Sequence, residues 1–164
     1  MSVRAVALWI HILAMVVVLG GYIFLSLFWW PVLVRAIPDV RVQVRLLGQT
    51  LRRFFTVVVL ALTVLVLTGG LYLLPPAYRA FGAGDEAGLA AFHLVLLWKL
   101  GMVFVVFILV PMQLFGLAFR LTRMDAGVYP FDPQLAARLG WRLQIVSYLI
   151  IVLLTAVVIL STQL

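Results

Sequence analysis

The chain has 164 residues, of which 66% are hydrophobic and only 10% are charged, a balance that excludes an ordinary soluble domain. It contains no cysteine, which excludes disulfides, thiolate catalysis, iron–sulfur clusters and thiolate copper sites within the chain. The formal net charge of +7 would suit a nucleic-acid-binding protein, but the arginines flank long apolar runs, so nucleic acid is not an expected partner.

Four apolar runs are long enough to cross the hydrocarbon core of a bilayer, which takes about 20 helical residues. They cover approximately residues 3–30, 54–75, 89–119 and 143–160. Because little chain is left over, residues 1–164 are predicted to form one domain, an all-α integral membrane protein built as a four-transmembrane-helix bundle. The first run is too long for a signal peptide, and the bulky "LFWWPVL" follows it where a cleavage site would need small residues.

The distribution of arginine predicts the topology of these four helices. Two connections, between the first and second runs and between the third and fourth, carry Arg35, Arg41, Arg45, Arg52, Arg53, Arg120, Arg123, Arg138 and Arg142. The N-terminus and the connection 76–88 together offer only Arg4 and Arg79. Cytoplasmic connections carry an excess of Lys and Arg. We therefore expect both termini on the outer, periplasmic side of a bacterial-type inner membrane, which the chain crosses several times.

In chain order, the first helix is predicted to end at an aromatic pair, Trp29 and Trp30, followed by Pro31. Asp39 is expected to cap a basic helix that leads into the second run. The stretch "VRVQVR" alternates like a strand, but a lone strand at a membrane surface would leave its backbone unpaired, so a helix is expected there. The second run closes with "TGGLYLLPP", and a flexible external loop is expected at residues 79–88.

The later boundaries follow from three further residues. Pro111 is predicted to kink the long third helix, and Asp132 with Pro133 is predicted to start the helix of the fourth run. The pairs Gly20-Gly21 and Gly69-Gly70 are candidate places where two helices, or a helix and a flat ligand, approach closely.

Lys99 is the most costly residue in the predicted membrane helices. It lies about 15 Å into the third run at 1.5 Å per residue, and a charged lysine near a span centre costs about 3 kcal/mol on insertion scales. The chain has only five acidic residues, none of them inside an apolar run, so no carboxylate is expected at this depth. Lys99 is therefore predicted to hydrogen-bond carbonyls or Gln113, to bind a metal as a neutral amine, or to pair with a propionate or phosphate. A lysine that snorkels into a water-filled crevice is the alternative.

The two histidines, His11 and His93, lie near the start of the first and third runs, which point in the same direction. Their depths are expected to agree within about 6 Å, and two histidines at matched depth on separate helices can hold a haem axially. His93 and Lys99 are about 120° apart around one helix, so only one of them can share an iron with His11. A hydrogen bond to a neighbouring helix is the other explanation for each histidine.

Each candidate ligand belongs to a stripe of residues on one helix face. The first stripe is His11, Met15, Val18, Tyr22 and Leu25, and the second is Leu96, Lys99, Met102, Val103 and Val106. Met15 and Met102 stand beside the candidate ligands, where they could pack against a porphyrin or bind copper, although methionine at helical spacing more often fills space.

The order of the motifs "LWIHI", "LRRFFTVVVLALTVLVLTGGLYLL" and "WKLGMVFVVFIL", with a basic connection before a fourth run, resembles the HemJ-type protoporphyrinogen oxidases and the CopD-type membrane domain. In HemJ-type proteins a histidine of the first span and a lysine of a later span are associated with haem b. The resemblance implies that His11 and Lys99 bind haem, and it extends less directly to Arg52 and Arg53. This chain departs from the pattern in having Trp98 directly before the lysine.

Three classes of function remain open at this stage. The first is a haem b-binding redox protein, an oxidoreductase if it oxidises a porphyrin substrate, which passes electrons to a membrane acceptor such as quinone. The second is a CopD-like copper-handling protein that uses His11, His93, Met15 and Met102. The third is a non-catalytic anchor whose polar residues face a partner subunit or a second copy of the chain.

Overall fold

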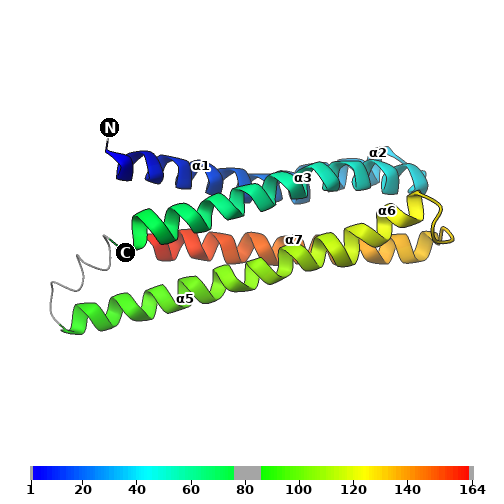
Figure 1. Cartoon of the computed structure of the whole chain (residues 1–164). Helices are drawn as coiled ribbons and strands as arrows, with labels where there is room; N and C mark the ends of the chain where they lie inside the picture. The colour runs from blue at the N-terminus through cyan, green and yellow to red at the C-terminus, as the bar shows by residue number, and fades with distance from the viewer. Residues whose placement is uncertain (1, 76–85, 163–164) are drawn as a thin grey trace.

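The computed structural model describes residues 2–75 and 86–162, and it is helical over nearly all of this length (Figure 1). Four helices are long and apolar enough to cross a membrane, namely Val3–Ala36, Val40–Tyr72, Leu89–Asp125 and Pro133–Ser161. The predicted all-helical architecture with four apolar helices is therefore confirmed. Of the loop predicted at 79–88, residues 79–85 lie outside the described part, and residues 86–88 are already helical.

Three of the four long helices contain a π-helical segment, in which the hydrogen bonds reach back five residues. The first long helix consists of α1 (Val3–Ile23), η1 (Phe24–Trp29) and α2 (Trp30–Ala36), and the second of α3 (Val40–Thr68) and η2 (Gly69–Leu73). The third consists of α5 (Glu86–Pro111), η3 (Met112–Ala118) and α6 (Phe119–Asp125), and the fourth is α7 (Pro133–Ser161). Segments of this kind are rare and occur frequently at functional sites.

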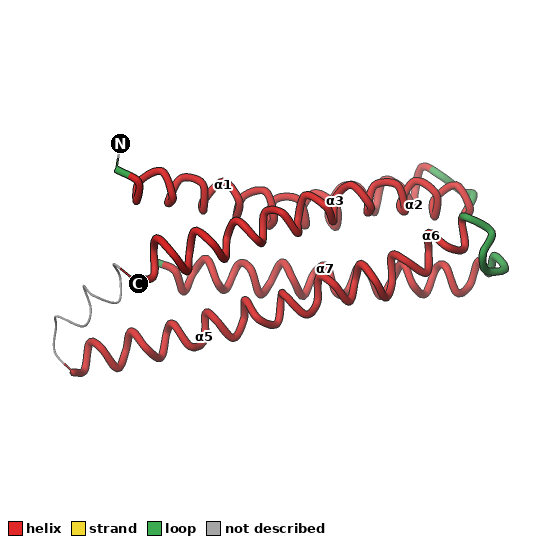
Figure 2. Tube along the Cα trace, in the orientation of Figure 1, coloured by secondary structure: helices red, strands yellow, loops and turns green. Residues whose placement is uncertain are grey.

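The helices run alternately up and down, so that α1 begins and α7 ends at the same end of the bundle (Figure 2). The two arginine-rich connections lie at the opposite end, where α2, α3, α6 and α7 come close together. From there α1 and α5 diverge toward the end at which α1 begins (Figure 1). The bundle is therefore tightest at its arginine-rich end and splayed at the other.

The first helix does not end at Pro31 as predicted but continues to Ala36. Just before the proline, the Trp30 N–H donates to the Leu25 carbonyl, five residues back, as the π-helical segment closes. Pro31 then stands in the first turn of α2. Proline has no N–H to donate, and a first turn is where a missing donor costs least. The change of hydrogen-bond register thus lets the helix pass through the proline.

The predicted helix starts are confirmed by side-chain caps. The Asp39 carboxylate accepts a hydrogen bond from the Arg41 N–H at 2.8 Å, and "VRVQVR" is the first part of α3 rather than a strand. Asp132 accepts from the Gln134 N–H at 2.9 Å, with Pro133 as the first residue of α7. In the third helix, Pro111 ends α5 and is followed directly by η3, so the hydrogen bonding changes from α to π geometry after the proline.

Glycines set how closely the helices pack. Of the two predicted pairs, Gly21 lies against the Phe54 ring and Gly69 against His11, whereas Gly20 and Gly70 have open space around them. The closest approach involves a glycine that the sequence did not single out. Gly140 of α7 lies so close to the Trp30 ring that a Cβ atom there would collide with it.

We predict that Gly140→Ala destabilises the bundle, because its methyl group must displace the Trp30 ring from between α2 and α7. Overpacking of this kind typically costs about 1–3 kcal/mol, which thermal unfolding in detergent would register as a lower midpoint. Gly101→Ala is the matched control, since a Cβ atom at Gly101 meets nothing within 4 Å. Equal midpoints for the two variants would contradict the packing described here.

Candidate functional site

His11 of α1 is half-buried and is held by a residue of the neighbouring helix α3. Its Nδ1 atom lies 2.8 Å from the Thr68 hydroxyl oxygen, and that hydroxyl donates its hydrogen to the Val64 carbonyl at 2.7 Å. A hydroxyl group has one hydrogen and two lone pairs. With that hydrogen on the Val64 carbonyl, the Thr68 oxygen can only accept from the ring, and the tautomer that fits this arrangement has its proton on Nδ1. The other ring nitrogen, Nε2, then carries the lone pair that can bind a metal.

The absence of a side chain at Gly69 makes room for this ring. A Cβ atom built on Gly69 would lie 3.2 Å from His11 Cε1, which is closer than nine in ten such contacts in proteins. Gly69 is also the first residue of η2, so the hydroxyl that holds the ring and the glycine that admits it are consecutive residues at the end of α3. This stretch of α3 and η2 therefore shapes the wall against which His11 lies.

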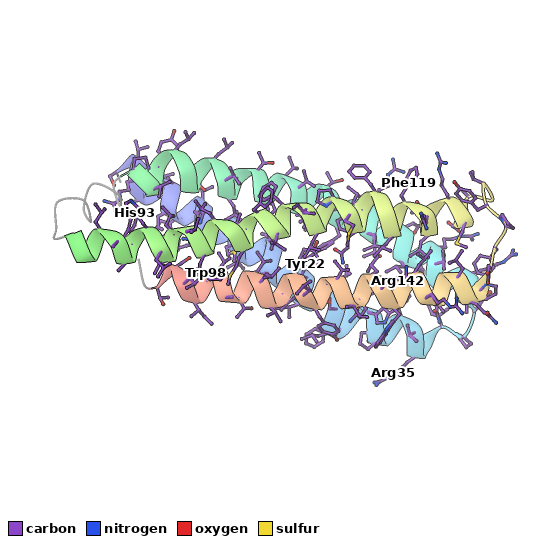
Figure 3. The ribbon with its side chains drawn as sticks, turned by 90° about the horizontal axis from the view of Figure 1, so that it is seen from below. Tyr22, Arg35, His93, Trp98, Phe119 and Arg142 are labelled. Atoms are coloured by element: carbon purple, nitrogen blue, oxygen red, sulfur yellow. The ribbon has the colours of Figure 1, made fainter. Side chains whose placement is uncertain are left out.

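Lys99 and His93 occupy different faces of α5. Lys99 is half-buried and belongs to a stripe that continues to Val106, which is 1% exposed. His93 is exposed, and its ring packs near that of Phe92 toward the start of α5 (Figure 3). Of the two candidates for a second ligand, the structure brings Lys99 to the inward side that carries His11.

The described acidic side chains do not reach Lys99. Asp39, Asp125 and Asp132 all lie at the arginine-rich end of the bundle, in or beside the connections between helices. Asp39 and Asp132 cap helices there, and Asp125 pairs with Arg45.

Gln113 does not serve Lys99, as the sequence had suggested it could. Its amide oxygen accepts from the Tyr22 hydroxyl at 3.1 Å. Its amide nitrogen donates to the Leu143 carbonyl at 2.9 Å and to the Ser147 hydroxyl at 2.8 Å, so both amide hydrogens are taken. The side chain is fully buried and ties the first, third and fourth long helices together.

A second buried polar contact lies close by along the first and fourth helices. The Gln144 amide donates to the Ser26 carbonyl at 2.7 Å, within the π-helical segment η1. Three atoms here, Ser26 Oγ, Trp29 Nε1 and Gln144 Oε1, are buried and form no hydrogen bond with the described residues. Sequence reasoning missed this layer, although the polar residues of α7 at 144 and 147 do share one helix face.

Arg52 and Arg53, which the resemblance associates with the cofactor, are not brought to His11. Both are exposed on α3. Their separation from Thr68 along the same helix is about 24 Å at 1.5 Å per residue. The structure therefore groups them with the arginine-rich end and not with the candidate ligands.

The candidate copper ligands are half-buried methionines. Met15 packs against the hydrophobic core, in the space-filling role common for methionine, and Met102 lies on the Lys99 face of α5. Among the residues that the structure describes, no group of three or more His, Cys, Asp or Glu side chains could hold a metal ion.

No family model, curated protein or solved structure matches this chain. The chemistry of the site is therefore argued from its two candidate donors, the His11 imidazole and the Lys99 amine. One imidazole with its second nitrogen fixed by a hydrogen bond, and one amine on another helix, fit a group that takes two axial ligands such as haem. They do not form the closed set of four ligands typical of structural zinc.

We predict that Gln113→Leu lowers the stability of the bundle, because it leaves the Tyr22 hydroxyl without its acceptor and removes the hydrogen bonds to the Leu143 carbonyl and the Ser147 hydroxyl. The expected loss is about 1–2 kcal/mol, measured as a shift of the unfolding midpoint in detergent. Gln134→Leu, at an exposed position of α7, is the control. An unchanged midpoint for Gln113→Leu would show that the polar layer does not hold the helices together.

Proposed function

We propose that this protein is a haem b-binding integral membrane redox protein that passes electrons to a membrane acceptor such as quinone. The observation that carries the proposal is the hydrogen bond between His11 Nδ1 and Thr68, which makes Nε2 the candidate axial ligand. Histidines that bind metals almost always donate their other ring N–H to an acceptor in this way. The resemblance to HemJ-type proteins points to the same histidine and, beyond it, to a protoporphyrinogen oxidase-like activity.

In this proposal Lys99 is the second ligand and Thr68 is a positioning residue. A neutral amine can bind iron, and binding would relieve the cost of a charged lysine that has no carboxylate at its depth. The half-buried position of Lys99 on the inward stripe of α5 supports its choice over the exposed His93. The haem would supply one-electron chemistry, and the chain would hold and orient it between α1 and α5.

The proposed topology has both termini on the outer side of a bacterial-type inner membrane. Two observations support it. The helix ends fall into two sets, with α1 beginning where α7 ends, and the connections that carry the arginine clusters lie together at the other end. Cytoplasmic connections carry such excesses of arginine.

We expect the protein purified from haem-replete cells to show the reduced-minus-oxidised bands of a low-spin b-type haem. His11→Ala and Lys99→Ala should each lose the low-spin bands, because each removes an axial ligand. His93→Ala is the matched control and should keep them, since His93 lies on an exposed face of α5. Absorption spectra with and without dithionite provide the measurement.

Two results would count against the assignment of ligands. A Lys99→Ala protein that keeps its full low-spin spectrum would reject Lys99 as the second ligand. A colourless wild-type protein in which elemental analysis finds copper would reject the haem proposal in favour of copper handling.

The topology makes a separate prediction. Alkaline phosphatase fused after the C-terminus should be active, and a green fluorescent protein fused there should not fluoresce, because the first needs the periplasm and the second the cytoplasm. The opposite pair of results would place the arginine-rich connections outside and contradict the proposed orientation.

A further inference from the structure

A groove of about 890 Å³ runs along the outside of the bundle, far along α3 from His11. One wall is formed by residues 45–60 of α3, and the other by residues 111–125 of the third long helix. The groove is partly open to its surroundings. In a membrane-spanning bundle such a groove faces the lipid, so the chemistry of its lining indicates what occupies it.

The two ends of the groove differ in polarity. The end nearest the arginine-rich connections is lined by Arg45, Gln49, Arg52, Thr122 and Asp125. The other end is lined by Val59, Leu60, Pro111, Leu114 and Phe115. From Arg45 to Leu60 the groove follows α3 for about 22 Å, which matches one leaflet of a bilayer about 40–45 Å thick with its headgroups. The polarity and the length of the groove thus match those of a lipid whose headgroup lies at the arginine-rich end.

The charge at the polar end favours an anion. The Arg45 side chain pairs with Asp125 at 3.2 Å, so these two charges largely cancel. The Arg52 side chain also lines the groove, and it forms no ion pair or hydrogen bond with the residues that the structure describes. The lining therefore has one uncompensated positive charge. A phosphate group is the common membrane anion that arginine binds well.

A second copy of the chain is less well suited to this groove. The described acidic residues at this end are already engaged, since Asp39 and Asp132 cap helices and Asp125 pairs with Arg45. A second copy would therefore bring no unengaged carboxylate to Arg52 from these positions. A neutral quinone would likewise leave the charge of Arg52 unmatched.

We propose that this groove binds one anionic phospholipid, with its phosphate at Arg52 and one acyl chain against Val59 and Phe115. Basic pockets between membrane helices on the cytoplasmic side are known binding places for anionic headgroups. The site is separate from the His11 site and does not depend on haem, so either proposal can fail without the other.

The test compares lipid binding to purified protein by native mass spectrometry, with phosphatidylglycerol, phosphatidylcholine and glycerol phosphate as probes. One phosphatidylglycerol should be retained more tightly than phosphatidylcholine, and glycerol phosphate should not compete, because it lacks the acyl chain. Arg52→Gln should weaken phosphatidylglycerol binding by about fivefold, as expected for the loss of one arginine near an anionic headgroup. Arg53→Gln is the control, since Arg53 is exposed but does not line the groove.

A second pair of variants tests the apolar end. Val59→Trp should fill the groove and also weaken phosphatidylglycerol binding, whereas Val57→Trp should not. The two valines are 44% and 49% exposed on the same helix, and only Val59 lines the groove. Circular dichroism would verify that all four variants keep their helical content.

Several results would overturn the proposal. Equal retention of phosphatidylcholine would reject the anionic headgroup, and equal effects of Arg52→Gln and Arg53→Gln would indicate attraction to the basic surface in general. Competition by glycerol phosphate would show that the groove binds a phosphate group without need of the acyl chain. A dimer whose formation is lost in Val59→Trp would assign the groove to a second copy of the chain.

Discussion

The hydrogen bond between His11 and Thr68 is the constraint on which the candidate site depends. It joins α1 to α3 through residues 57 positions apart in the chain and fixes the orientation of a ring that could otherwise rotate. While the Thr68 hydroxyl donates to its own helix, the bond favours the ring tautomer with its proton on Nδ1. Gly69 beside it provides the space for the ring. In the proposed function, this contact would leave Nε2 as the nitrogen that binds iron.

Departures from regular helix geometry coincide with the polar contacts of the bundle. The segment η1 contains the Ser26 carbonyl that Gln144 reaches, η2 begins beside His11, and η3 contains Gln113. In lipid, helices associate through packing and polar contacts, since the lipid tails are as apolar as the helix surfaces. The π-helical segments thus occur where the helices are joined by hydrogen bonds.

Much of the fold could be predicted from the sequence because the signals are local. The lengths of the apolar runs predicted the four helices, and the helix caps at Asp39 and Asp132 follow from the chemistry of single residues. Helical periodicity also predicted that Lys99 shares a face with Val106. The prediction that the first helix ends at Pro31 was wrong. The change of hydrogen-bond register in η1, which accommodates the proline, has no signal in the local sequence.

The partners of the site residues could not be predicted from spacing within one helix. Thr68 and Tyr22 lie on other helices than the residues that they bind, and their pairing depends on how the helices rotate against one another. Spacing alone places Lys99 and His93 on different faces of α5, but which of the two faces turns inward depends on the same rotation. The roles assigned to His11 and Lys99 remain predictions from chemistry and resemblance.

The most direct measurement is the tautomer of His11 in the haem-free protein, read from its ¹⁵N chemical shifts by solid-state NMR in bilayers. A protonated Nδ1 and an unprotonated Nε2 are expected, and Thr68→Val should abolish this preference because it removes the acceptor. A proton on Nε2 in the wild-type protein would contradict the proposed role of Thr68 and leave His11 without a nitrogen prepared to bind iron.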